Sequence, residues 1–241
     1  EAFYMTNRVM TVSFHRYGDF FPGTGDLKDM GEGEGKGYAV NVPLLNGLDD
    51  DSFVNIYQTI MESVRSRFRP EVVVIQCGAD SLAYDKLGTY NTTLRSHGKC
   101  VKVVKDWNLP LLVLGGGGYT IKNVARCWAY ETGICLGIEL DNDLPLNDYY
   151  ELAGNDKKLH FDPKPDCKNE NTREYLEFIQ AKCLSNINTL EHAPSVGITD
   201  YLATDFFEHE NDDHNRLHKA QHYNDLNAQL AKPVVSEYEE K

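Results

Sequence analysis

The stretch Glu71-Val-Val-Val-Ile-Gln-Cys-Gly-Ala-Asp80 decides the class of fold that this sequence can adopt. Its apolar run is short, which is typical of a strand buried on both faces of a sheet. A glycine and an aspartate follow the run, and a second apolar run at residues 109–114 ends in consecutive glycines. Both patterns favour strands of a parallel sheet, in which ligands bind beyond the carboxyl ends of the strands.

The segments around these two strands alternate between helical and extended patterns. Asp49, Asp50 and Asp51 stand where a helix N-terminus favours side-chain caps and negative charge, and apolar residues then recur at helical spacing up to Pro70. Further helices are predicted over residues 92–107, 121–136 and 172–190, and further strands over residues 8–15 and 38–44. This order predicts an α/β fold of three layers, αβα, in which a mostly parallel sheet lies between two layers of helices.

Composition identifies a globular chain and excludes several classes of function. The 241 residues carry 24 basic and 37 acidic side chains, a net charge of −13, which excludes a generally basic nucleic-acid binder. Every apolar run is far shorter than the roughly 20 residues that a membrane span needs. We therefore expect neither nucleic acid nor a membrane as a direct partner. The cysteines form no Cys-x-x-Cys pair, which argues against a cysteine zinc module and fits a reducing compartment.

Two residues after the predicted strands are candidates for chemistry. Asp80 is a helix cap or turn residue on one interpretation, and a metal ligand or acid–base group on the other. Tyr119 follows glycines 115–118, which form either a tight turn or a close approach of the backbone to a ligand. Its phenol can donate a hydrogen bond to a developing oxyanion. Asp85 is interpreted as a loop residue. His15 is ambiguous, since a lone histidine at the end of a strand is more often a satisfied core residue.

Three histidines near the carboxyl end form a separate candidate for metal binding. His214, His218 and His222 recur every four residues and would share one face of a helix, where they can chelate a metal. The stretch is acidic and lacks the flanking glutamate of a metalloprotease pattern. A solvated polar face is therefore the competing interpretation.

Four segments, taken together, resemble a known family. They are Arg8-Val-Met-Thr-Val-Ser-Phe-His15, Phe20-Phe-Pro-Gly-Thr-Gly-Asp26, Gln76-Cys-Gly-Ala-Asp-Ser81 and Leu114-Gly-Gly-Gly-Gly-Tyr-Thr120. Their order and spacing are similar to those of the class I histone deacetylases, zinc-dependent lysine deacetylases with an arginase/deacetylase-like fold. The resemblance covers residues 1–195, which we expect to be the carboxyl-terminal part of a catalytic domain whose amino-terminal part is missing. Residues 196–241 are expected to be an acidic, flexible tail.

The resemblance implies an enzyme that uses zinc to hydrolyse acetyl-lysine on histone tails in transcriptional repression. Asp80 would be one of three zinc ligands, and Tyr119 would polarise the acetamide carbonyl and stabilise the oxyanion. Phe21 would line the narrow tunnel for the lysine stem, with Leu87 at its rim. Gly117 would let the tunnel wall approach closely.

Further ligands follow from the same resemblance. Potassium would bind at two sites, largely through main-chain oxygens, one formed by Ser13 and Phe14 and the other by Phe3, Thr6, Val9 and Tyr38. Lys86 and Lys122 stand where related enzymes carry arginines that hold an inositol phosphate between enzyme and corepressor. Lysine keeps the positive charge but loses the fork geometry of arginine. The implied partners are acetylated histone tails and corepressor proteins, and the implied location is the nucleus, with the cytoplasm as an alternative.

Part of the family's site has no counterpart in this sequence. The family's histidine pair and its Asp-x-His zinc motif precede a Glu-Ala-Phe segment, and this chain starts at Glu1-Ala-Phe3. A catalytic zinc normally needs three protein ligands, so we expect no deacetylation by this chain alone. Two interpretations stay open: a piece of a longer, active deacetylase, or a truncated, non-catalytic paralogue that acts as a corepressor interaction module.

Overall fold

The computed structural model describes residues 2–153 and 156–190, so the predicted acidic tail and its three histidines lie outside the described residues. The described part follows the element order that the sequence predicts. Its strands are β1 (Thr11–Arg16), β2 (Ala39–Leu44), β3 (Val73–Gln76) and β4 (Leu111–Leu114), and its α-helices are α1 (Asp50–Arg67), α2 (Leu94–Lys105), α3 (Ile121–Leu136) and α4 (Arg173–Asn188). Three short 3-10 helices, η1 (Gly33–Gly35), η2 (Ala79–Ser81) and η3 (Tyr150–Ala153), lie between them.

The described strands form two parallel pairs. β1 pairs with β2, with Thr11 opposite Ala39, and β3 pairs with β4, with Val73 opposite Leu111. Parallel neighbours need a crossover connection, which α2 provides between β3 and β4. The predicted α/β class with parallel strands is therefore confirmed.

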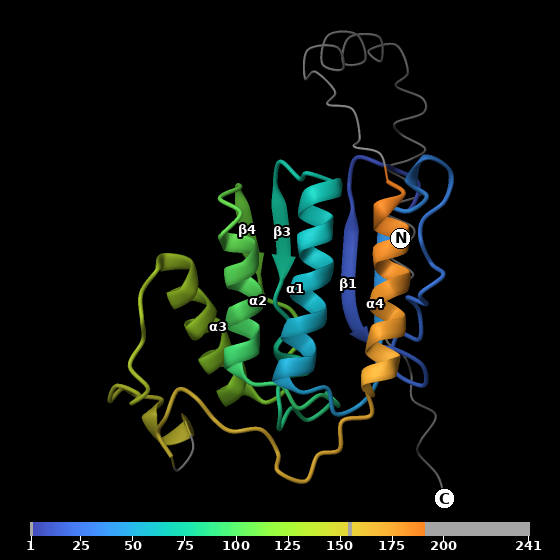
Figure 1. Ribbon diagram of the computed structural model, residues 1–241. Coiled ribbons are helices and arrows are strands. Elements are labelled where there is room, and N and C mark those ends of the chain that lie inside the picture. The colour runs from blue at the N-terminus through green and yellow to red at the C-terminus, as the bar shows by residue number, and fades with distance from the viewer. Residues whose placement is uncertain (1, 154–155, 191–241) are drawn as a thin grey trace, which may run out of the picture. The chain divides into compact units, whose positions relative to one another are not determined.

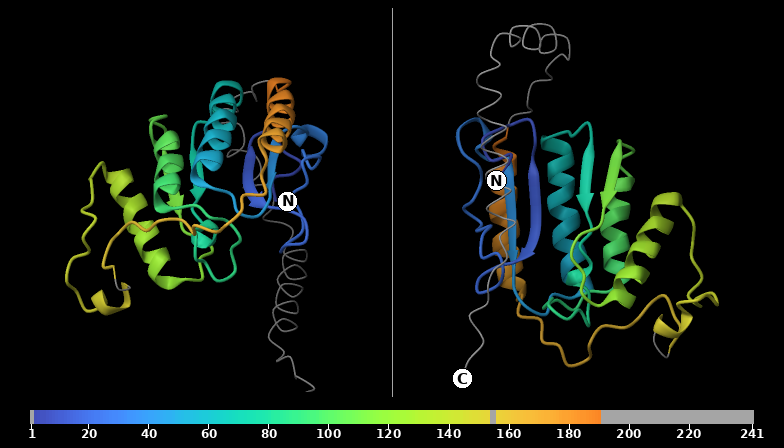
Figure 2. Two further views of the ribbon diagram at one scale, coloured as in Figure 1. Left: turned by 60° about the horizontal axis from the view of Figure 1, so that its bottom comes forward. Right: turned by 180° about the vertical axis from the view of Figure 1, so that it is seen from behind.

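The core lies between these strands and one layer of helices. α1, α2 and α4 stand side by side against the same face of the strands (Figure 1; Figure 2, right). Leu44 of β2, Ile60 of α1 and Ile187 of α4 are fully buried in one apolar cluster. A second cluster packs Tyr57 of α1 and residues of α2 against β3. Because α1 contributes to both clusters, it joins the two strand pairs.

The outer face of β3 and β4 differs from the expectation. Val73 and Ile75 pack against the helices, but the alternate side chains of Val74, Leu112 and Leu114 are 59%, 52% and 44% exposed. We expected β3 and β4 to be buried on both faces. This expectation is wrong for the described residues, because the described helices cover only one face of these two strands.

The N-terminus of α1 is capped as the aspartate run predicts. Asp49 Oδ1 accepts a hydrogen bond from Ser52 N at 2.8 Å, and Asn169 Nδ2 donates to Asp49 Oδ2 at 2.9 Å. Burial disfavours the charged form of this carboxyl. The hydrogen bonds prevail over burial and hold the pKa of Asp49 below its ordinary value of 3.8.

Asp49→Ala is expected to lower the free energy of unfolding by about 1 kcal/mol at neutral pH, because the cap is lost. The folded-state pKa is depressed, so the carboxylate stabilises the fold above its unfolded-state pKa. This stabilisation is lost as the pH falls through the lower, folded-state pKa. Urea denaturation at a series of pH values measures the difference, with Asp51→Ala at an exposed position of the same turn as the control. A difference that stays constant at acid pH would contradict a cap that depends on charge.

Candidate functional site at the carboxyl ends of β3 and β4

The carboxyl ends of β3 and β4 bring Asp80 and the glycine ribbon 115–118 together. Cys77 N donates to Leu114 O at 2.8 Å, and Ala79 N donates to Gly117 O at 2.7 Å, so the pairing continues past the strands. η2 turns the chain directly after β3 and places the half-buried Asp80 beside the ribbon. Two segments that the sequence marked separately therefore form one edge.

Gly117 permits this close approach because it has no side chain. A β-carbon at this position would lie 2.1 Å from Asp80 Oδ2, which is closer than any real contact. Burial raises the pKa of the Asp80 carboxyl above its ordinary value, and the negative charge of Asp85 acts in the same direction. The site thus holds a carboxylate in a position where a nearby positive charge would stabilise it.

Asp85 is a buried clamp rather than an ordinary loop residue. Its Oδ1 accepts hydrogen bonds from Leu87 N and Gly88 N, both at 2.8 Å. Its Oδ2 accepts from Tyr119 N at 2.7 Å and from Thr120 N at 3.2 Å. The carboxylate therefore fixes the backbone that carries Tyr119. The signal in the sequence is the spacing Asp85-x-x-Gly88, which is typical of an Asx turn.

The described structure brings only some of the predicted tunnel residues together. The side chain of Tyr119 is 46% exposed, and Leu87 lies at the opposite end of the Asp85 clamp. Phe21 lies in the loop after β1 and is 90% exposed. The contacts found among the described residues do not place Phe21 against Asp80 or Tyr119. A tunnel for a lysine stem stays a prediction.

The predicted potassium ligands lie on β1, in the segment before it and directly before β2. Ser13 Oγ lies 2.9 Å from His15 Nδ1, and His15 Nε2 lies 2.8 Å from Gly25 O, so the half-buried His15 ties β1 to the following loop. Thr6 N donates to Phe3 O at 3.3 Å, and Thr11 N donates to Tyr38 O at 3.0 Å. Phe14 packs on the core from β1, and Val9 lies two residues before that strand. Their role as potassium ligands stays a prediction.

The two lysines assigned to an inositol phosphate flank the same clamp. Lys86 follows Asp85 directly, Lys122 lies in the first turn of α3, and both are exposed. The hydrogen bond from Thr120 N to Asp85 Oδ2 holds these two chain positions in one region. Binding of a phosphate there stays a prediction.

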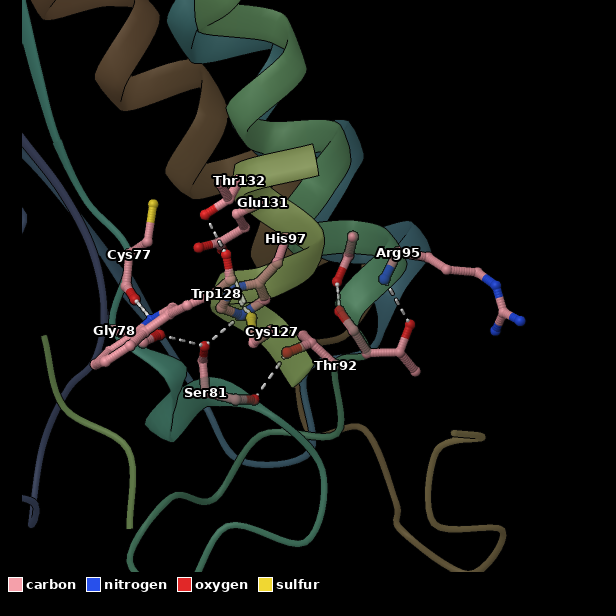
Figure 3. Close-up of polar contacts among 12 residues, drawn as sticks. Cys77, Gly78, Ser81, Thr92, Arg95, His97, Cys127, Trp128, Glu131 and Thr132 are labelled. Atoms are coloured by element: carbon pink, nitrogen blue, oxygen red, sulfur yellow. Dashed lines mark hydrogen bonds and ion pairs between the residues drawn. The ribbon is translucent and has the colours of Figure 1, made fainter. Parts of the chain in front are cut away.

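The described residues also contain a buried group of three side chains that could hold a metal ion. His97, Cys127 and Glu131 are buried, and their ligand atoms lie within 4.8 Å of one another (Figure 3). Asp80 is not part of any such group among residues 2–153 and 156–190. These residues therefore do not by themselves form the three-ligand zinc site that the resemblance implies. The sequence signal that we missed is Cys127 and Glu131 at i, i+4 on one helix.

Known proteins are similar to this chain over most of its length. Residues 1–135 match the histone deacetylase domain model. The chain is 53% identical over 219 residues to histone deacetylase HDAC1 of Drosophila melanogaster. This match covers 91% of this chain and 42% of that protein. It is 57% identical over 196 residues to histone deacetylase 1 of Homo sapiens. This match covers 81% of this chain and 40% of that protein.

A relative from Dictyostelium discoideum, type-1 histone deacetylase 1, is 53% identical over 213 residues, covering 88% of this chain and 43% of that protein. The chain thus spans about two fifths of the length of these curated relatives. The described helices include none that is long and apolar enough to cross a membrane.

Proposed function

Because this chain belongs to the histone deacetylase family, we propose that it supplies part of the active site of a zinc-dependent lysine deacetylase acting on histone tails. The single observation that carries this proposal is the edge where Asp80 packs against the glycine ribbon that leads to Tyr119. Gly117 lets the Asp80 carboxylate pack against the ribbon, and Asp85 holds the backbone of Tyr119. A carboxylate that can bind a metal and a phenol that can donate a hydrogen bond, both at one edge of the sheet, would suit the hydrolysis of an amide.

Each residue has a defined task in the proposed reaction. Zinc, when bound, would polarise the acetamide carbonyl, and Asp80 would contribute one of its ligands. The Tyr119 hydroxyl would donate a hydrogen bond to the carbonyl oxygen as negative charge develops on it. Leu87 and Phe21 would cover the lysine stem. Among the described residues, Asp80 belongs to no group of three metal ligands, so the further ligands and a proton-transfer group would come from outside the described residues.

The relatives' names support a further part of the proposal, which concerns partners and location. Proteins named histone deacetylase 1 are the relatives that match, so acetylated histone tails are the proposed substrate class. The proposal has three further parts. The partners are corepressor proteins, potassium is a second bound ion, and the protein acts in the nucleus as part of transcriptional repression.

The test compares this 241-residue chain with the full-length product that contains it, using an acetyl-lysine histone peptide. We expect turnover by the longer product and none by this chain alone. In the longer product, Tyr119→Phe is expected to lower kcat about 100-fold, because one donor to the oxyanion is removed. Tyr149→Phe, at an exposed position, is the matched control. Turnover by this chain alone, or a longer product inactive on acetyl-lysine, would contradict the proposal.

The exposed apolar face of β3 and β4 favours a second candidate, a non-catalytic interaction module. Val74, Leu112 and Leu114 form an apolar surface of the kind found at protein interfaces. This candidate predicts that the chain captures corepressor components without zinc, and that Leu112→Asp abolishes the capture. Capture that survives Leu112→Asp would remove the support that this face gives.

A further inference from the structure

We propose that a line of hydrogen bonds starting on α3 positions Asp80, the zinc ligand of the proposed function, on which this inference rests. The line consists of the side chains of Glu131, His97 and Ser81 (Figure 3). Glu131 lies on α3, His97 lies on α2, and Ser81 ends η2 directly after Asp80. These three are positioning residues, because they hold the turn and the turn holds the carboxylate.

Both ring nitrogens of His97 are used within the line. His97 Nε2 lies 2.7 Å from Ser81 Oγ, and His97 Nδ1 lies 3.2 Å from Glu131 Oε1. Cys127, one turn before Glu131, donates to the same Oε1 at 3.6 Å, and Ser81 Oγ donates to Gly78 O at 3.2 Å. His97 and Glu131 are 7% and 2% exposed, so little water can replace these bonds. Because a buried polar group that loses its partner is costly, the line keeps a fixed geometry.

Ser81 connects this fixed geometry to the turn that carries Asp80. The carbonyl oxygen of Ser81 accepts a hydrogen bond from Thr92 Oγ1 at 2.8 Å, so its backbone is held as well as its side chain. On the other side of Asp80, Ala79 N donates to Gly117 O at 2.7 Å. The residues directly before and after Asp80 are therefore both anchored, one to the glycine ribbon and one to the buried line.

The carboxylate of Asp80 depends on this turn for its direction. Burial raises the pKa of Asp80 above its ordinary value, and hydrogen bonds from the backbone N–H groups of Asp80 and Ser81 oppose that rise. A displaced Ser81 would move one of the two N–H groups that hold the carboxylate. Metal ligands bind best when neighbouring groups fix their geometry in advance, so this movement would weaken metal binding.

A purely structural role is the alternative for this buried line. In that case, breaking the line lowers the free energy of unfolding but leaves the affinity of Asp80 for zinc unchanged. The positioning role predicts a loss of zinc affinity that a comparable loss of stability elsewhere does not produce. It also predicts that His97 acts on Asp80 only through Ser81.

The experiment measures the dissociation constant of zinc in the longer product by competition with a chelator of known affinity, with urea denaturation of each variant alongside. Ser81→Ala is expected to raise this constant about 10-fold. His97→Gln should raise it less, because the amide can still reach Ser81 but has no group at the position of Nδ1. Cys183→Ala, at a buried thiol of α4 outside the line, is the control and should leave the constant unchanged.

A double variant tests whether His97 acts through Ser81. In the Ser81→Ala background, His97→Gln is expected to have no further effect on the zinc constant, because the line is already broken. Effects that add would overturn the inference, and so would a zinc constant in Ser81→Ala equal to that of Cys183→Ala. If Ser81→Ala did not fold, the comparison of His97→Gln with Cys183→Ala would decide the same question.

The zinc measurement needs no substrate, so it is independent of the deacetylase assay. Asp80→Asn identifies the measured ion, and a zinc constant unchanged in this variant would overturn the inference. A longer product that binds zinc through Asp80 but leaves acetyl-lysine uncleaved would contradict the proposed function and not the positioning role. Normal turnover together with an unchanged zinc constant in Ser81→Ala would do the reverse.

Discussion

Asp85→Ala is expected to lower the free energy of unfolding by roughly 3–5 kcal/mol, because it removes a buried acceptor that serves several donors at once. Leu87 N and Gly88 N lose their partner on one side, and Tyr119 N and Thr120 N lose theirs on the other. Alanine offers no oxygen in exchange. The loop after η2 then separates from the start of α3.

Urea denaturation of both proteins measures this loss. Asp85→Asn keeps one carbonyl oxygen and is expected to fall between the wild type and alanine. The control is Asp106→Ala, because Asp106 is an exposed residue paired with Lys102 at i, i+4, and such pairs contribute about 0.5 kcal/mol. If Asp85→Ala were no more destabilising than Asp106→Ala, the clamp would not stabilise the fold.

Trp128→Ala is expected to lower the free energy of unfolding by about 3 kcal/mol through lost ring packing and a lost hydrogen bond. The indole nitrogen of Trp128 donates to Cys77 O at 2.9 Å, just after β3. A β-carbon at Gly115 would lie 2.9 Å from the Trp128 ring, so the ring packs directly on the glycine ribbon. Without it, the ribbon and the end of β3 lose their contact with α3.

Trp128→Phe separates the two contributions. Phenylalanine keeps an aromatic ring but has no N–H, so the hydrogen bond alone should account for about 1 kcal/mol of the loss. The chain has two tryptophans, so the fluorescence of Trp107, buried beside α2, still reports unfolding in both variants. Equal losses for alanine and phenylalanine would mean that the ring contributes little.

The elements of the fold could be predicted because their signals are local. The predicted helix over residues 121–136 coincides with α3, since Gly137 adopts a left-handed conformation with φ 72° directly after it. Asp49 caps α1 through a contact three residues away. Strand pairing follows from the alternation of strands and helices, which restricts the topology.

The Asp85 clamp and the group of His97, Cys127 and Glu131 could not be predicted because their contacts are distant in sequence. Asp85 meets Tyr119 across 34 residues, and His97 meets Glu131 across the same separation. Such contacts exist only once the helices and strands have packed. An apolar run such as Glu71-Val-Val-Val-Ile75 also gives no sign of whether a second layer covers its outer face, and so the exposure of Val74 was not predicted.

The outer face of β3 and β4 also affects the self-association and solubility of the chain. Val74, Leu112 and Leu114 are apolar side chains in contact with water, and among the described strands β3 is paired only with β4. An exposed apolar strand with an open edge favours association with other copies. The net charge of −13 opposes this association, but dissolved salt screens the repulsion. The solubility of this chain is therefore expected to fall as the ionic strength rises, even where the folding free energy is unchanged.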